Sequence, residues 1–198
     1  MPRTVTVEEH PLGLTWVVEE PMERAFHALA DGGRVWLVDP LDDPGLADAI
    51  ALGEPAGVLQ LLDRHNRDCA EIAARLGVPH LRVPDTVPDS PFATIAPLRV
   101  PRWKETALWW PARRALVVAE VLAANPMHTG GEQAVGLHLF LRPWPPQSLR
   151  GYRPQHLLVG HGHGVHGPEA ATGLETAYAR SRRDLPRVLR ALPRTGRS

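Results

Sequence analysis

The feature that most constrains this fold is a polar loop between a short apolar run and an amphipathic segment. Residues 57–62 form a short run that is rich in branched side chains, which is typical of a buried strand. After the loop at residues 63–68, Ile72 and Leu76 recur at helical spacing, and a Gly-Val-Pro segment ends the helix. Residues 78–83 then suit another strand. This order predicts an α/β unit whose loop lies where such folds place ligands.

The rest of the chain continues in alternating strands and helices. Residues 84–101 contain five prolines and indicate a linker-like crossing that cannot sustain a helix. Pro168 suits the first turn of a helix, and Pro186 should kink or split that helix. Strands are predicted at 15–19, 34–38, 57–62, 81–83, 106–110, 115–121 and 156–159, and helices after Pro44, after Arg67, at about 132–141 and at about 169–192.

Composition narrows the class of protein. A chain of 198 residues, 43% hydrophobic and 22% charged, fits a single globular domain over 1–198, with halves of about 1–90 and 91–198. Lys and Arg together number 22, as do Asp and Glu, so no net charge favours nucleic acid or an acidic membrane. The single Cys excludes an intrachain disulfide and fits a reducing compartment, and no apolar run approaches the length of a membrane span. We therefore expect a cytoplasmic protein whose partner is an unknown small molecule, with no nucleic acid and no membrane. A homo-oligomer is compatible with this composition.

The order of elements resembles that of the metallo-β-lactamase superfamily. Residues 35–40, Val-Trp-Leu-Val-Asp-Pro, are similar to a strand of that family that ends in a structural Asp, here Asp39. The family then has a loop of the form His-x-His-x-Asp-His. Aligned on Asp68, this chain has Arg64 and Asn66 at the first two His positions and Cys69 at the last. The resemblance implies an αββα sandwich of two packed mixed sheets with helices outside.

Two later segments carry the same resemblance. Residues 104–120 look like the family hairpin that ends in Gly-Asp, where this chain has Ala119-Glu120. Residues 156–162 are similar to the last strand and its Gly-His-Gly, with His161 at the position of the ligand. The resemblance implies a metal held by Asp68, Glu120 and His161, assisted by Cys69 or by His65, which is displaced by one residue. A family site uses about seven ligands, so most are missing and no tight cofactor is expected; zinc or another divalent metal is the alternative.

Each candidate residue has a structural interpretation beside the functional one. Asp68 suits the cap of the following helix as well as a ligand, and Cys69 suits a small buried residue. Arg64 and Arg67 suggest that ion pairs have replaced the cation, because a buried carboxylate without its metal needs another positive partner. With Asn66, these two arginines are cleft candidates.

The remaining candidates lie in the second half of the chain. His128 is either a general base in the cleft or a hydrogen-bonded surface residue. His163 belongs to a His-rich, Gly-rich turn that either faces the cleft or is solvated. Glu105 points either to the cleft or to solvent. Catalytic candidates are therefore Asp68 and His128.

Three functions follow from these observations. The leading hypothesis is a protein that has lost most metal ligands and is non-catalytic or binds an unknown small ligand in the residual cleft. The first alternative is a mononuclear metal-dependent hydrolase that uses Asp68, Glu120 and His161, so the chain, if active, is a metallo-hydrolase. The second alternative is a scaffold that acts through oligomer contacts.

Overall fold

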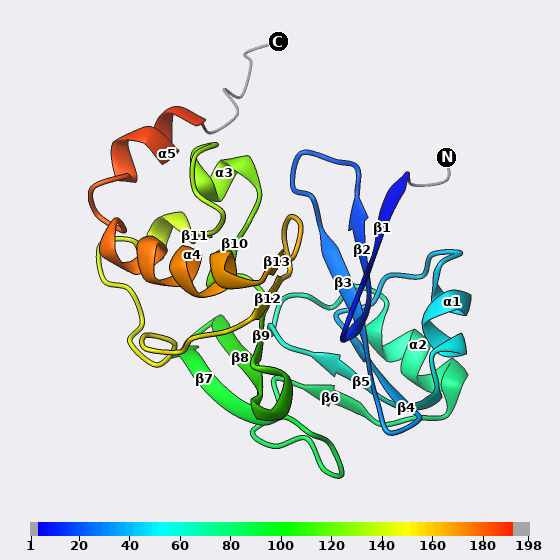
Figure 1. The fold of residues 1–198 in the computed structure, drawn as a ribbon. Helices are drawn as coiled ribbons and strands as arrows, with labels where there is room; N and C mark the ends of the chain where they lie inside the picture. Colours follow the sequence, from blue (N-terminus) through cyan, green and yellow to red (C-terminus); the bar gives the residue numbers. More distant parts are fainter. Residues whose placement is uncertain (1–3, 192–198) are drawn as a thin grey trace.

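The protein folds as two mixed β-sheets that pack against each other, with helices on the outer faces (Figure 1). The computed structural model describes residues 4–191. Each half of the chain forms one sheet, and the two sheets meet with their inner faces. This is the αββα sandwich expected from the sequence.

The first sheet has six strands in the order β1-β2-β3-β4-β5-β6. The first four strands are antiparallel, and β4, β5 and β6 are parallel to one another. The strands are β1 (Val5–His10), β2 (Gly13–Val18), β3 (Ala25–Asp31), β4 (Arg34–Val38), β5 (Glu54–Gln60) and β6 (His80–Arg82).

The second sheet has five strands in the order β13-β12-β9-β8-β7. Only β9 and β12 are parallel neighbours; the other pairs are antiparallel. The strands are β7 (Ala93–Val100), β8 (Trp103–Trp110), β9 (Ala115–Val118), β12 (His156–Val159) and β13 (Val165–His166).

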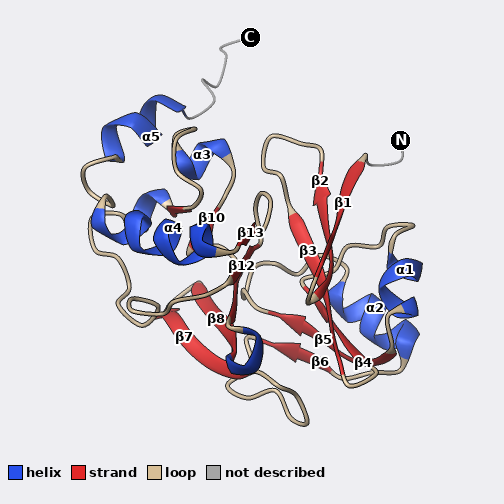
Figure 2. Ribbon diagram, viewed as in Figure 1, coloured by secondary structure: helices blue, strands red, loops and turns tan. Residues whose placement is uncertain are grey.

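Helices cover the outer face of each sheet, as Figure 2 shows by colour. The first sheet is covered by α1 (Leu46–Ala51) and α2 (Cys69–Leu76), and the second by α4 (Pro168–Ala179). The smaller elements are η1 (Pro111–Arg113), β10 (Leu122–Ala123), α3 (Pro126–Thr129), β11 (Gly136–Leu137), η2 (Leu139–Leu141) and α5 (Leu185–Ala191). None of the described helices is long and apolar enough to cross a membrane.

The central strands are apolar on both faces because each face belongs to a different core. In β9, Val117 joins the core between the sheets, whereas Leu116 joins the core under α4. In β4, Trp36 points to the space between the sheets, and Leu37 packs toward α1 and α2. Such continuous apolar runs are typical of strands buried on both faces, which explains why they could be located from the sequence.

Two expectations about the second half were wrong. The helix predicted at about 132–141 is instead β11, which pairs with β10, followed by η2. Gly136 lies so close to the backbone of His128 that a side chain at this position would overlap the His128 carbonyl. The buried guanidinium of Arg142 also enters this region and donates to the carbonyls of Leu137 and His128. The linker-like segment contains strand β7, in which the pairing with β8 is irregular between Ile95 and Leu98.

The predicted last helix divides in two, as the proline at position 186 implied. Pro168 lies in the first turn of α4, which ends at Ala179, and Pro186 lies in the first turn of α5. The predicted end of this helix, Leu192, lies outside the described residues.

Candidate metal centre

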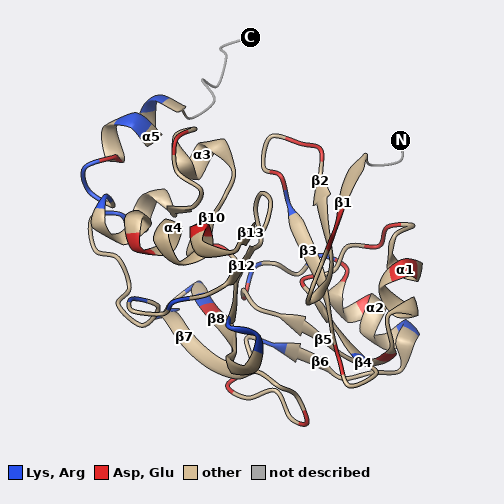
Figure 3. Ribbon diagram, in the orientation of Figure 1, with Lys and Arg blue, Asp and Glu red and all other residues tan. Residues whose placement is uncertain are grey.

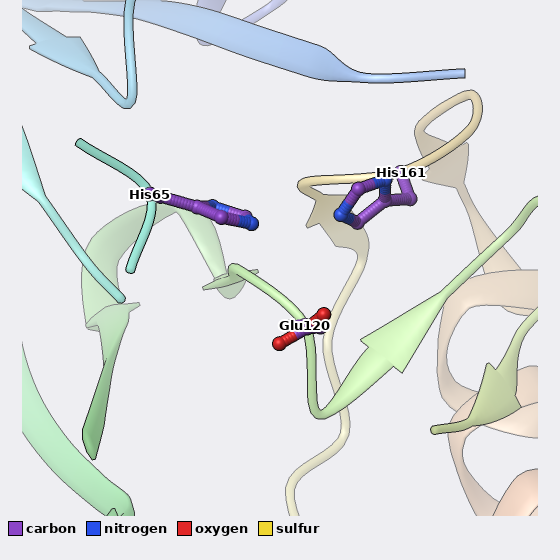
Figure 4. Close-up of side chains that lie close together, drawn as sticks. All are labelled: His65, Glu120 and His161. Atoms are coloured by element: carbon purple, nitrogen blue, oxygen red, sulfur yellow. The ribbon is translucent and has the colours of Figure 1, made fainter. Parts of the chain in front are cut away.

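Three side chains from three loops converge where the two sheets meet (Figure 4). His65 follows β5, Glu120 follows β9 and His161 follows β12, so each stands beyond the carboxyl end of a strand. One potential ligand atom from each residue lies within 4.8 Å of the others. Ligand sites in open α/β sheets commonly lie at such strand ends.

His65 is oriented by a carboxylate behind it. Its Nδ1 is 3.2 Å from Oδ2 of Asp39, whose other oxygen accepts the backbone N–H of Leu61. Burial raises the pKa of Asp39, but His65, Arg67 and the Leu61 N–H outweigh burial and hold the pKa below its usual range. The ionised Asp39 therefore accepts a hydrogen bond from Nδ1–H of His65, and in this tautomer Nε2 is the nitrogen left for a ligand. A carboxylate behind a histidine is the usual support of a metal-binding imidazole.

His161 is oriented in the same sense by a backbone carbonyl. Its Nδ1 lies 3.0 Å from the carbonyl oxygen of Met22, so Nδ1 carries the proton. Its Nε2 is buried and has no hydrogen-bond partner among the described residues. Burial, together with His65 and Arg67, lowers the pKa of His161 to about 4, so the ring is neutral near pH 7. A buried, unpaired nitrogen lone pair is costly, and a cation would satisfy it.

Glu120 is the one carboxylate of this group, and it has a cationic partner. Its Oε2 accepts from Nη2 of Arg64 at 2.6 Å and from Nε at 3.2 Å, while the guanidinium lies over the ring of Trp103. Burial raises the pKa of Glu120, but the bonds and charge of Arg64 outweigh burial and lower it. The predicted ion pair that involves Arg64 is thus confirmed.

The loop that carries Glu120 is held by a second, fully buried carboxyl group. Glu105 accepts the backbone N–H groups of Ala119, Glu120 and Val121. Burial raises the pKa of Glu105 to about 8, against these three N–H groups, which favour the ionised form. Glu105 therefore faces the inside of the protein and fixes the backbone of Glu120; it does not face the cleft.

Two further imidazoles stand beside the group. His128 donates from Nδ1 to Oδ1 of Asn125 at 2.6 Å, because this oxygen also accepts the backbone N–H of His128 and is therefore an acceptor. Burial lowers the pKa of His128 to about 3, so the ring is neutral and Nε2 carries the lone pair. His138 accepts the backbone N–H of Phe140 at Nδ1, so Nε2 carries its proton. Sequence reasoning missed His138, because it was placed inside a helix.

Arg67 ties the two sheets together behind the group. Its guanidinium is buried and donates to the carbonyls of Ala25, Asp39 and Gly160. It pairs with neither Asp68 nor Glu120, so only Arg64 behaves as the predicted replacement for a cation. The bonds of Arg67 instead fix the strand ends that carry Asp39 and His161.

Four other predicted residues lie outside the group. Asp68 does not converge with Glu120 and His161, because its carboxylate turns to accept the backbone N–H of Asp42 at 2.7 Å. It is the N-cap residue of α2 but makes no side-chain cap bond. The Cys69 thiol is buried against the carbonyl of His65, and burial raises its pKa. Asn66 accepts from Gln60 at 3.3 Å, and the exposed His163 pairs with Glu8 at 2.6 Å.

Comparisons with known proteins give the fold a name. The chain is similar in structure to the DIM-1 metallo-β-lactamase, with 11% identity and a TM-score of 0.63 over 92% of this chain and 98% of that one. It is also similar to the protein VMB-1, with 8% identity and a TM-score of 0.56 over 91% of this chain and 96% of that one. No protein-family model and no curated protein matches the sequence. The chain therefore has the metallo-β-lactamase fold, as its motifs implied, with very divergent residues.

Proposed function

We propose that this protein binds one zinc ion through Nε2 of His65, Nε2 of His161 and one oxygen of Glu120. The observation that carries this proposal is the common orientation of the two imidazoles. In both rings Nδ1 hydrogen-bonds to an acceptor of the protein, Asp39 for His65 and the Met22 carbonyl for His161. The Nε2 atoms are then available to the space that the two rings share with Glu120. Two His and one Glu form a known type of catalytic zinc site with an open fourth position.

The donor set fits zinc better than a hard cation. Neutral imidazole nitrogens suit zinc and related transition metals, whereas magnesium and calcium take oxygen ligands. Among residues 4–191, this is the one group of three or more His, Cys, Asp or Glu side chains close enough to hold an ion. A single ion is therefore proposed instead of a pair, since Arg64 and Asn66 stand at two of the family's His positions, and Asp68 and Cys69 lie outside the group.

The reaction class that this arrangement supports best is hydrolysis. Zinc held by His65, Glu120 and His161 would supply polarisation of a substrate oxygen and ionisation of water near neutral pH. The chain itself orients the ligands through Asp39 and Met22, and places the donor Nε2–H of His138 3.9 Å from Glu120. Arg64 balances the charge of Glu120 before an ion enters. The similarity to a protein named as a metallo-β-lactamase supports the same class.

A second function is favoured by one contact. The guanidinium of Arg64 already neutralises Glu120, as a cation would. If this pair persists in solution, the site has exchanged its metal for an arginine, and the protein binds a small ligand without catalysing a reaction. Metal binding distinguishes the two functions.

The test is a calorimetric titration of zinc into untagged, chelator-treated protein. We expect one equivalent to bind and to raise the melting temperature, because a ligand that binds only the native state stabilises it. His161→Ala and His65→Ala should abolish both effects. His163→Ala is the matched control, because it removes an exposed imidazole from outside the group. No zinc binding by unmodified protein, or equal loss in the control, would favour the metal-free function.

A further inference from the structure

A small cavity adjoins the proposed metal centre on the side of Glu120. Its volume is about 130 Å³. For comparison, an apolar protein cavity of roughly 150 Å³ accepts benzene, so this space suits a phenyl ring or a branched alkyl group. Its walls are mostly apolar and are formed by Met22, Met127, Leu139 and Phe140.

One wall is an aromatic ring that the fold leaves uncovered. Phe140 is 74% exposed although it borders the cavity. It also contacts His138 at the cavity rim, with ring centroids 5.4 Å apart. An exposed apolar side chain beside a cavity is a common feature of ligand sites.

Beside Glu120, the polar residues that line the cavity are His128 and His138, which supply one acceptor and one donor. The acceptor is the unprotonated Nε2 of His128, and the donor is Nε2–H of His138; neither makes a hydrogen bond among the described residues. Burial lowers the pKa of both rings, and Glu120 is paired with Arg64.

We propose that this cavity recognises a secondary amide that carries a compact apolar substituent. This inference deepens the proposed function, on which it rests for its position beside the metal. A secondary amide presents one N–H and one carbonyl oxygen, which match the acceptor of His128 and the donor of His138. An ester, a thioester or a lactone has no N–H, so it would leave the lone pair of His128 unsatisfied, and a buried acceptor without a partner is costly.

The test compares three probes that share a phenyl ring and a carbonyl group. N-methylbenzamide has the amide N–H, whereas N,N-dimethylbenzamide and methyl benzoate lack it. Ligand-observed NMR titrations on chelator-treated and on zinc-loaded protein give the Kd of each probe. We expect N-methylbenzamide to bind about tenfold more tightly than the other two, the usual effect of one buried hydrogen bond.

Two variants separate the two parts of the recognition. His128→Leu should remove the preference for N-methylbenzamide while all three probes still bind. Phe140→Ser should weaken all three probes about equally; its side chain is exposed, so the fold is retained. Trp144→Ser is the matched control, because Trp144 is 81% exposed and does not line the cavity. It should change no Kd.

The outcomes also separate this inference from the metal proposal. Equal binding of the three probes, or no effect of Phe140→Ser, would overturn the inference even if zinc binds. A preference for N-methylbenzamide in protein that binds no zinc would support the inference and reject the metal. The circular dichroism spectrum of each variant confirms that a lost preference does not reflect unfolding.

Discussion

Arg64→Gln should increase the affinity of the site for zinc. In the metal-free protein the guanidinium bonds to Oε2 of Glu120 at 2.6 Å and thus competes with a cation for the same carboxylate. When an ion is bound, the guanidinium remains nearby as a like charge. Removal of the charge therefore favours the ion in both respects.

The size of the effect follows from distance and exposure. Metal–oxygen distances of about 2.0–2.2 Å place the guanidinium roughly 5–7 Å from an ion on Glu120. The side chain of Arg64 is 45% exposed, so the dielectric is close to that of water. A divalent ion and a unit charge about 6 Å apart then repel each other by about 1.4 kcal/mol. This corresponds to a Kd about tenfold lower in the variant.

The assay is a competition titration of zinc against a chromophoric chelator at fixed ionic strength. Arg75→Gln is the control, since Arg75 forms an exposed pair with Asp42 and the change alters the net charge equally, away from the site. A Kd that is unchanged or higher in Arg64→Gln would refute the reasoning, because it would show that Arg64 supports the metal site.

Three further predictions concern the support of the site. Gly160→Ala should destabilise the protein and weaken zinc binding, because a methyl group there would overlap the backbone carbonyl of Ala119. Gly173→Ala in α4 should not, because the added methyl would meet Ala134 and Val135 at ordinary van der Waals distances; thermal melts compare the two variants. Asp39→Asn should raise the Kd for zinc about 10- to 100-fold by loosening the orientation of His65, as the same competition titration would show. Burial lowers the pKa of His27 from 6.5 to about 3. Its contribution to the free energy of unfolding is therefore full above pH 6.5 and falls as the pH decreases. The free energy of unfolding measured with urea should thus fall by about 2 kcal/mol between pH 7.5 and 5 because of this residue. His27→Gln should remove that part of the pH dependence.

The parts of the fold that could be predicted from sequence are the strands that are apolar on both faces. β4 and β12 were predicted residue for residue, because both faces of each strand are buried and the runs are continuously apolar. β1 was missed because it has no such run; it is polar and largely exposed. β3 was missed because its alanines have weak strand preference, and it is buried only through its neighbours.

The site could be predicted only in part. Glu120 and His161 come together as expected because they follow adjacent parallel strands of one sheet. The sequence favoured Asp68 over His65 as a ligand, whereas the structure places His65 in the group and Asp68 outside it. The direction of a loop side chain depends on tertiary partners such as Asp39, which lies 26 positions from His65 in sequence. Periodicity carries no information about such contacts.

X-ray absorption spectroscopy at the zinc edge tests the central claim most directly. For zinc-loaded protein we predict a first shell of nitrogen and oxygen at about 2.0–2.1 Å and outer scattering from two imidazoles. His65→Ala and His161→Ala should each remove one imidazole contribution. A sulfur ligand at about 2.3 Å, a neighbouring metal ion, or the absence of imidazole scattering would contradict a single ion held by His65, Glu120 and His161.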